Sequence, residues 1–242
     1  MTAIGILGSE GRMGRAIAAI AADFGATVAG GVDAGGDPLA LAKTSDVLVD
    51  FTAPSALEAN LAAACAAGTP IVIGTTGLQA PHFALIDNAA ARIALIQTNT
   101  TSLGITLLAR LVADAAARLG PDWDIEIVEA HHRHKVDAPS GTALLLGDAA
   151  ADGRGANLAD LKVVDRAGLT GARSEGTIGF SAIRGGSIAG DHHVIFAGDG
   201  ERLEFTHRAE SREMFARGAV RAALWLAGQP AGRYSMVEVL GL

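Results

Sequence analysis

The residues best suited to chemistry lie in one short segment, 129–143. Five potential cations occupy consecutive positions 131–135 within it: three histidines, an arginine and a lysine. Histidine gains and loses a proton near neutral pH, so it suits proton transfer, and arginine and lysine attract anions. The segment therefore predicts a site that binds an anion and moves a proton.

The flanking sequence predicts the elements that hold this segment. The alternating run Asp124–Val128 predicts a strand before it, and the Ala- and Leu-rich run Thr142–Ala151 predicts a helix after it. Pro139 and Gly141 mark a turn, and Ser140 is expected to cap the helix N-terminus. The amides of the first helical turn lack intrahelical partners, so they would offer an anion further donors.

Two other interpretations of the cluster have to be weighed. Histidines collect on metals, but adjacent His131 and His132 point apart on a strand, and no acidic or thiol side chain lies at a ligand interval. Many charged clusters are solvated surface loops. Five potential cations in a chain of net charge −7 argue against that interpretation, which stays open.

The same segment resembles the 4-hydroxy-tetrahydrodipicolinate reductase (dihydrodipicolinate reductase) family of lysine and diaminopimelate biosynthesis. That family carries E-x-H-H-x-x-K-x-D-A-P-S-G-T-A, and every fixed position matches residues 129–143. The resemblance implies an oxidoreductase that reduces 4-hydroxy-tetrahydrodipicolinate, a cyclic dicarboxylate, to tetrahydrodipicolinate with hydride from NADH or NADPH. Family-like segments also occur at Asp50–Pro54 and Tyr234–Leu240, so the resemblance covers nearly the whole chain.

The resemblance implies a role for each matched residue. His131 is expected to be the general acid, and Lys135 a second proton donor that also holds the substrate. The expected substrate-binding residues are His132, Lys135, Ser140, Gly141 and Thr142. Because cationic side chains and helix amides can hold developing negative charge, no metal is expected.

A second candidate site begins at the N-terminus. The apolar run Ala3–Leu7, the glycine turn Gly8–Gly14, the helical pattern Arg15–Phe24 and the apolar run Thr27–Val32 lead to Asp33. An acid nineteen residues after the last glycine suits a dinucleotide-binding fold, where it meets the ribose hydroxyls. The spacing G-x-x-G-x-x-G alone supports a purely structural turn equally well. The family has the same G-x-x-G-R-M-G, which favours the dinucleotide interpretation.

Two later turns resemble the segments that contact nicotinamide in the family. Residues 74–77 follow the expected strand 70–73, and residues 98–104 align with A-x-N-F-S-x-G, although Asn99 stands one place early and Thr101 replaces the aromatic residue. Asp33 is followed by Ala34 rather than a basic residue, and Glu10 stands where some relatives have lysine, so NADH is expected to be preferred, with NADPH possible. The expected cofactor-binding residues are Gly8, Ser9, Glu10, Gly11, Arg12, Met13, Asp33, Gly74, Thr75, Thr76, Thr98, Asn99, Thr100 and Thr101.

Composition narrows the class of protein. The chain has 242 residues, of which 50% are hydrophobic and 19% charged, which indicates a globular protein with an ample core. Its acidic balance disfavours nucleic acid as a partner. Polar residues and a proline interrupt the apolar stretch 53–73, and the N-terminus reads as a strand rather than a signal peptide, so neither a membrane partner nor export is expected. The single Cys65 cannot form an internal disulfide, which suits the cytoplasm.

The order of the expected elements predicts an α/β protein with two domains. A Rossmann-like dinucleotide-binding domain is expected over residues 1–101 and 212–242. An inserted α+β domain for substrate binding and oligomerisation, with an antiparallel or mixed sheet, is expected over 102–211. The runs 177–183, 187–196 and 202–209 are expected to be antiparallel strands, with His192 and His193 at a strand start near an oligomer surface. The resemblance implies a homotetramer.

Two other functions share the first domain. A different nicotinamide-dependent dehydrogenase of aspartate-family amino-acid metabolism would lack the His-His-x-x-Lys segment. A dinucleotide-sensing regulator should carry a basic DNA-binding helix, and the sequence has none.

Overall fold

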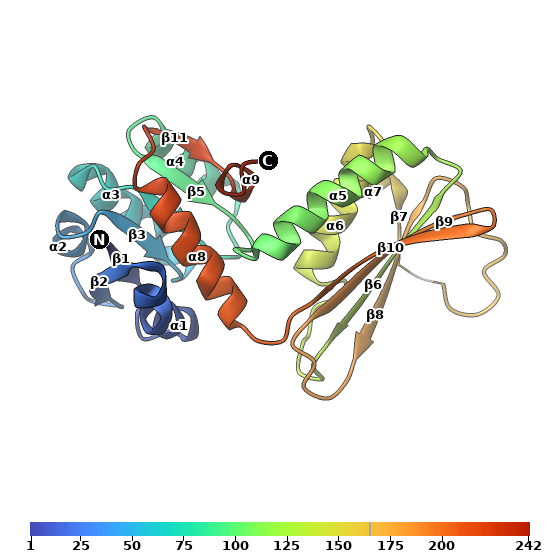
Figure 1. The fold of residues 1–242 in the computed structure, drawn as a ribbon, viewed down its shortest axis with the longest axis horizontal. Helices are drawn as coiled ribbons and strands as arrows, with labels where there is room; N and C mark the ends of the chain where they lie inside the picture. The colour runs from blue at the N-terminus through green and yellow to red at the C-terminus, as the bar shows by residue number, and fades with distance from the viewer. Residues whose placement is uncertain (165) are drawn as a thin grey trace. The chain divides into compact units, whose positions relative to one another are not determined.

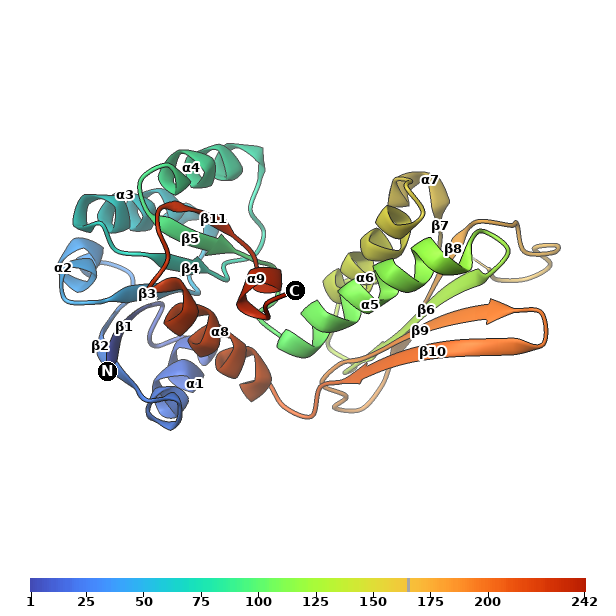
Figure 2. The same cartoon turned by 45° about the horizontal axis from the view of Figure 1, so that its top comes forward.

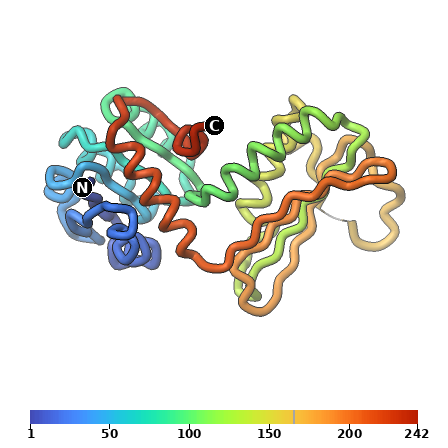
Figure 3. Tube along the Cα trace, viewed as in Figure 1, coloured from blue at the N-terminus to red at the C-terminus, as the bar shows by residue number. Residues whose placement is uncertain are grey.

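The computed structural model describes residues 1–164 and 166–242, and the chain divides into two compact units (Figure 1). The first unit contains Met1–Leu103 and Glu213–Leu242, and the second contains Gly104–Arg212. The chain therefore leaves the first unit once, builds the second, and returns. Figure 3 shows this return, with the red C-terminal segment lying beside the blue N-terminal one.

The first unit alternates strands and helices, which predicts a parallel sheet covered on both faces. Its elements are β1 (Thr2–Leu7), α1 (Arg12–Ile20), η1 (Ala21–Phe24), β2 (Ala26–Val32), α2 (Pro38–Lys43), β3 (Val47–Asp50), η2 (Pro54–Ala56), α3 (Leu57–Ala67), β4 (Ile71–Ile73), α4 (Ala80–Ala90), β5 (Ala94–Gln97), α8 (Glu213–Leu226), β11 (Gly232–Tyr234) and α9 (Met236–Val239). The first residues of α5 (Leu103–Leu119) lead out of the unit.

The sheet of the first unit has six strands in the order β11-β5-β4-β3-β1-β2, and every pair is parallel. The central strands β3 and β4 are buried along their whole length, as expected for a sheet covered on both faces. The strand order reverses between β1 and β3. In open α/β sheets, ligands bind beyond the carboxyl ends of the strands at such a reversal.

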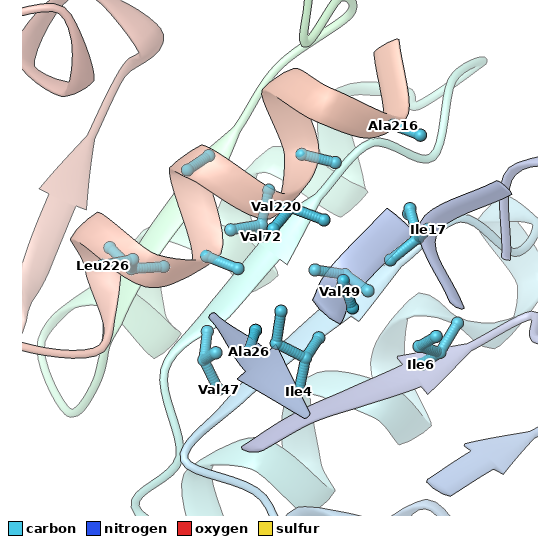
Figure 4. Close-up of a cluster of buried hydrophobic side chains, with 14 of the residues drawn as sticks. Ile4, Ile6, Ile17, Ala26, Val47, Val49, Val72, Ala216, Val220 and Leu226 are labelled. Carbon is cyan, nitrogen blue, oxygen red and sulfur yellow. The ribbon is translucent and has the colours of Figure 1, made fainter. Parts of the chain in front are cut away.

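Helices α1 and α8 pack on one face of this sheet, and α2, α3 and α4 on the other. Figure 4 shows the first of the two cores, where Ala216, Val220 and Leu226 of α8 meet Val49 and Val72 of the central strands. The buried residues of α8 recur at helical spacing and form one apolar face. The C-terminal segment is thus part of the core of the first unit.

The second unit is a five-stranded sheet with two long helices on one face (Figure 2). Its elements are α5 (Leu103–Leu119), β6 (Asp124–His131), α6 (Gly141–Gly153), α7 (Leu158–Leu161), β7 (Lys162–Val163), β8 (Ile178–Arg184), β9 (Asp191–Gly198) and β10 (Glu201–Arg208). The strand order is β10-β9-β6-β8-β7. Alternate residues of β6, including Ile125 and Ile127, pack under α5 and α6.

The three strands expected over 177–183, 187–196 and 202–209 run in alternating directions as predicted, but β8 pairs with β6 and β7 rather than with β9. Strands β9 and β10 are antiparallel to their neighbours, but β8 runs parallel to β6 and to β7. The physical reason is α6, which lies between β6 and β8 in the sequence. A helical crossover brings the chain back to the same end of the sheet, so the next strand runs in the same direction. The α/β fold class is confirmed, and the sheet of the second unit is mixed.

Within the described residues, no helix is both long enough and apolar enough to cross a membrane.

Candidate active site

A pocket of about 440 Å³ lies at the carboxyl ends of the strands of the first unit. It takes residues from the glycine turn after β1, from the turns after β3, β4 and β5, and from α8. Ten of the expected cofactor residues line it: Gly11, Arg12, Met13, Gly74, Thr75, Thr76, Thr98, Asn99, Thr100 and Thr101. The other lining residues are Phe51, Thr52 and Phe215.

Glycine is required in the turn that precedes α1. Gly8 has a φ of +84°, and a Cβ there would lie 2.7 Å from the carbonyl oxygen of Phe51. A Cβ on Gly14 would lie 2.2 Å from the carbonyl oxygen of Gly8. Gly11 caps α1 without a side-chain hydrogen bond, so the first-turn amides of this nine-residue helix lack intrahelical acceptors. The turn offers these donors at the rim of the pocket.

Asp33 lies beside the glycine turn but does not line the pocket. Its carboxylate accepts hydrogen bonds from Ser9 Oγ (2.5 Å) and from the Glu10 amide (3.1 Å). Glu10 in turn pairs with Arg15 at 2.8 Å. Ser9, Glu10 and Asp33 therefore form a hydrogen-bonded group, and Gly8, the fourth expected cofactor residue outside the pocket lining, donates its amide to the carbonyl oxygen of Val32.

A buried carboxylate, Asp50, fixes the turns that form the floor of the pocket. It is fully buried at the end of β3 and accepts hydrogen bonds from the Thr52 hydroxyl (2.6 Å), the Thr75 hydroxyl (2.9 Å) and the Asn60 amide group (3.0 Å). Thr75 comes from the next strand, so Asp50 ties two pocket turns together. A Cβ on Gly74 would lie 2.3 Å from the Phe51 ring, which explains the glycine there.

Thr101 holds the last turn of the pocket to α8 rather than facing outward. It is 2% exposed, and its hydroxyl donates to the carbonyl oxygen of Phe215 at 2.6 Å. Next to it, the Thr98 hydroxyl donates to the carbonyl oxygen of Thr100 at 2.6 Å. The Thr98 hydroxyl thus stabilises the turn itself, and the Thr101 hydroxyl fastens the turn to α8.

In the second unit, the expected acid His131 stands at the end of β6. Its Nδ1 lies 2.6 Å from Oε2 of Glu129, and both residues are buried. A carboxylate oxygen accepts but does not donate, so Nδ1 carries a proton and the other ring nitrogen is available for exchange. Burial favours the neutral carboxyl, but hydrogen bonds from Arg184 and His131 outweigh it and lower the pKa of Glu129.

Glu129 bonds to more than His131. Both of its oxygens accept from Arg184 at 2.7 Å, and Oε1 also accepts from the Ser140 amide at 3.1 Å. Arg184 donates further to the carbonyl oxygen of Asp137 at 2.7 Å. Lys135 pairs with the Asp137 carboxylate at 2.8 and 2.9 Å, and this bond lowers the pKa of Asp137.

The expected cap of α6 is confirmed. The Ser140 hydroxyl accepts from the Ala143 amide at 3.1 Å, and Ser140 shows the extended backbone of an N-cap. Gly141 and Thr142 begin the helix, so their amides lack intrahelical acceptors. His132 lies nearby with a buried Nδ1 that has no partner among the described residues. Burial and the positive charge of Arg212, with His134, His131 and Lys135, lower the pKa of His132.

The expected surface position of His192 is wrong. It is 4% exposed, its ring stands edge-on to that of His131 with centroids 5.2 Å apart, and its Nε2 hydrogen-bonds with Ser140 Oγ at 3.0 Å. Burial, reinforced by the charge of His131, lowers the pKa of His192 to about 4. The reason for the position is register: β9 runs antiparallel to β6, and His192 lies opposite Glu129.

Two family models together match almost all of this chain. The model described as "Dihydrodipicolinate reductase, N-terminus" matches residues 2–100, and the one described as "Dihydrodipicolinate reductase, C-terminus" matches residues 104–240. The chain belongs to the dihydrodipicolinate reductase family.

Relatives and a solved structure agree with this family. A 4-hydroxy-tetrahydrodipicolinate reductase from Zymomonas mobilis is 55% identical over 246 residues, covering 99% of this chain and 97% of the relative. The enzyme of that name from Afipia carboxidovorans is 48% identical, covering 98% and 96%. The structure of a dipicolinate-bound dihydrodipicolinate reductase from Paenisporosarcina sp. TG-14 superposes with a TM-score of 0.78 at 23% identity, covering 98% of each chain, which shows the shared fold.

Sequence reasoning missed several residues at these two places in the dihydrodipicolinate reductase fold. Phe51 and Thr52 follow a strand end, which is a signal that could have found them. Phe215 comes from α8, far along the chain, and carries no local signal. Glu129 stands beside the histidine cluster in the sequence, but Arg184 lies far along the chain, and their pairing depends on β6 and β8 being neighbours. No group of three or more potential metal ligands is assembled among residues 1–164 and 166–242.

Proposed function

We propose that this chain reduces 4-hydroxy-tetrahydrodipicolinate to tetrahydrodipicolinate with NAD(P)H, in lysine and diaminopimelate biosynthesis. The names and high identity of its relatives support this reaction. The observation that carries the proposal is one carboxylate, Glu129, that bonds both to His131 and to the Ser140 amide at the start of α6. A proton-transfer group and an anion-binding helix terminus are thereby fixed beside each other.

The pocket of the first unit fits a dinucleotide. Gly8 and Gly14 allow the tight turn, Gly11 would let the backbone approach a pyrophosphate, and the first-turn amides of α1 would donate to it. The turns after β4 and β5 would hold the nicotinamide ribose and amide, with Asp33 and its bonded neighbours Ser9 and Glu10 beside the adenosine ribose. When bound, the reduced nicotinamide supplies the hydride.

The segment 131–142 would bind the dicarboxylate. His132 is a candidate because Arg212, His134, His131 and Lys135 lie around it; burial, together with their positive charge, lowers its pKa. A flat diacid needs at least two anion-binding groups to fix its orientation. The amides of Gly141 and Thr142 and the ammonium of Lys135 would provide them, and Ser140 would contribute by capping the helix that carries the two amides. Hydrogen bonds to such ionised groups are stronger than neutral ones.

His131 would donate the proton that the ring takes up after hydride transfer. Its Nδ1–H is held by Glu129, so a second proton on Nε2 is the one that can leave. Lys135 would serve as a second donor and as a clamp on a carboxylate. Its bonds to both Asp137 oxygens fix the position of the ammonium group.

Substitution of the two proposed donors tests these roles. His131→Gln and Lys135→Ala should each lower kcat by roughly 10²-fold or more, because general acid catalysis contributes about that much. NADH binding, measured by fluorescence titration, should hardly change, since neither residue belongs to the unit with the dinucleotide pocket. A folded variant with near-native kcat would contradict the role of the residue it replaces.

NADH should be preferred over NADPH. Asp33 and Glu10 would place two carboxylates near a 2′-phosphate, and Ala34 supplies no cation. The preference should be on the order of 1–3 kcal/mol, the size of a hydrogen bond to an ionised group. We expect kcat/KM, measured at one ionic strength, to be higher for NADH, and Ala34→Arg to raise the value for NADPH. An equal or higher wild-type value for NADPH would refute the preference.

We further propose that the chain forms a homotetramer in the cytoplasm. The sheet face of the second unit opposite α5 and α6 carries Val128, Ile183 and Ile195, and Ile183 is 52% exposed. Apolar residues on an uncovered sheet face favour self-association. Analytical ultracentrifugation should give four times the 24.4 kDa chain mass, and Ile183→Glu should weaken assembly. A monomeric wild-type protein at micromolar concentration would contradict this proposal.

A further inference from the structure

One ion pair in the second unit, between the buried Glu129 and the half-buried Arg184, bonds to three separate parts of the proposed substrate site. Glu129 is 1% exposed and accepts from His131 Nδ1 (2.6 Å) and from the Ser140 amide (3.1 Å). Arg184 bonds to both Glu129 oxygens at 2.7 Å and to the carbonyl oxygen of Asp137 at 2.7 Å. The pair thus bonds directly to the acid, the start of α6 and the turn that holds Lys135.

We propose that Glu129 and Arg184 are positioning residues, which set the acid His131, the helix terminus at Ser140 and the Lys135–Asp137 turn in one fixed arrangement. Neither residue is assigned a reaction step. The inference rests on the proposed roles of His131 and of α6.

The carboxylate of Glu129 suits this task because it receives four donors. Oε1 accepts from the Ser140 amide and Arg184, and Oε2 from His131 and Arg184. An amide in its place could accept at one oxygen only, and its NH2 group would face donors. Any orientation of a glutamine therefore leaves either His131 or the start of α6 without its acceptor. A buried donor without an acceptor is costly, so the local structure should shift.

Arg184 suits its part because the guanidinium is a planar fork. It reaches both oxygens of one carboxylate and still donates to carbonyl oxygens of Asp137 and Ile183. A lysine ammonium keeps the charge but cannot reproduce the fork. Arg184→Lys should therefore retain the ion pair and loosen the geometry.

The structure offers a matched control on the same strand. Glu126 also accepts hydrogen bonds from two arginines, Arg166 (2.6 Å) and Arg173 (2.9 Å). It lies three positions before Glu129 in β6, so its side chain projects from the other face of the sheet. Glu126→Gln makes the same chemical change outside the proposed site, and its oligomeric state is measured because its face of the sheet is the one proposed to assemble.

The experiment compares steady-state kinetics of wild type, Glu129→Gln, Arg184→Lys and Glu126→Gln. For Glu129→Gln we expect kcat/KM for the ring substrate to fall roughly 10²-fold, with kcat lower and KM higher, because misplacement by about 1 Å can have an effect of that size. Arg184→Lys should give a smaller loss of the same pattern, and Glu126→Gln should stay near wild type. The Kd for NADH should be unchanged in all of them.

Two binding and spectroscopic readouts separate positioning from a general structural defect. The Kd for dipicolinate should rise in Glu129→Gln, because the helix terminus has shifted. The ¹⁵N shifts of the His131 ring, assigned by their loss in His131→Gln, should show protons redistributed between Nδ1 and Nε2. Far-UV circular dichroism and oligomeric state should match wild type. If Glu129→Gln does not fold, the same measurements are made on Arg184→Lys.

The proposal is overturned if folded Glu129→Gln, or folded Arg184→Lys in its place, keeps wild-type kinetics and wild-type His131 ¹⁵N shifts. It is also overturned if Glu126→Gln, with the oligomeric state of wild type, loses as much activity as Glu129→Gln. Failure of the proposed function looks different, since wild type itself would then not reduce the ring substrate, and failure of the role of His131 would leave His131→Gln with near-native kcat. Loss of activity in His131→Gln together with full activity in Glu129→Gln refutes the positioning role alone.

Discussion

The burial of His192 makes a quantitative prediction about stability and pH. Burial, reinforced by the charge of His131, lowers the pKa of His192 from 6.5 to about 4. The residue is only 4% exposed, so solvent screens this effect little. One pKa unit corresponds to about 1.4 kcal/mol, so the shift of His192 should make about 3 kcal/mol of the free energy of unfolding depend on pH.

The sign follows from the protons that each state binds. Between pH 6.5 and about pH 4, the unfolded chain protonates His192 while the folded protein keeps it neutral. Unfolding therefore takes up a proton, and the free energy of unfolding falls as the pH falls through this window. Below about pH 4 both states carry the proton, and this contribution stops changing. The charged groups that influence the ring, His131, Glu129, His207 and Lys135, remain in a variant that lacks it.

The assay is urea unfolding of wild type and His192→Gln at a fixed protein concentration, in steps from pH 7 to pH 4. Carboxylates contribute to both proteins, so the difference between them is the quantity to follow. Wild type should lose about 3 kcal/mol more than the variant over this range. His193→Gln is the matched control, because His193 projects from the opposite face of β9 and bonds with Thr206. The free energy of unfolding of His193→Gln should depend on pH as that of wild type does. If the unfolding free energies of wild type and His192→Gln fell in parallel with pH, the reasoning would be refuted.

Two further predictions concern backbone and buried donors. Gly141→Pro should raise the substrate KM much more than Gly141→Ala or Thr142→Val. Proline fits the first helical position and removes only the backbone N–H. Alanine keeps the N–H, and its Cβ would have no atom within 4 Å. Equal KM values for the three variants would show that the amide of Gly141 does not hold the carboxylate. Asn60→Leu should destabilise the protein by about 1–3 kcal/mol, because it removes a donor from the buried Asp50. A melting temperature of Asn60→Leu equal to that of wild type would contradict this expectation.

The sequence predicted well those features that depend on near neighbours in the chain. The strand-turn-helix unit at the N-terminus and the Ser140 cap each need only a few consecutive residues, and both are present. The direction of β8 agrees with the prediction, but its parallel pairing with β6 was not predicted, although a signal existed. The expected helix between the two runs already implied a crossover, and a crossover favours parallel strands.

The surroundings of His131 could not be predicted in the same way. His192 lies beside His131 because β9 pairs with β6 in a register that sets His192 opposite Glu129. Arg184 lies opposite His131 because β8 pairs with the other edge of β6. A shift of one residue in either pairing would move the partner to the opposite face. Periodicity indicates that a strand exists, but it does not fix the pairing register.

The two units use a buried carboxylate for the same purpose, with different partners. Asp50 ends β3 and is bonded by neutral donors from Thr52, Asn60 and Thr75, whereas Glu129 is bonded by Arg184 and His131, which can carry charge. A carboxylate can accept several donors at once, so one acid at a strand end can tie together turns that are distant in the sequence. Neutral donors suffice where the turns have only to hold a shape. Where a neighbouring ring is proposed to gain and lose a proton, the arginine keeps the carboxylate ionised in both states of that ring. In the proposed mechanism, Glu129 then holds His131 in the same place before and after proton transfer.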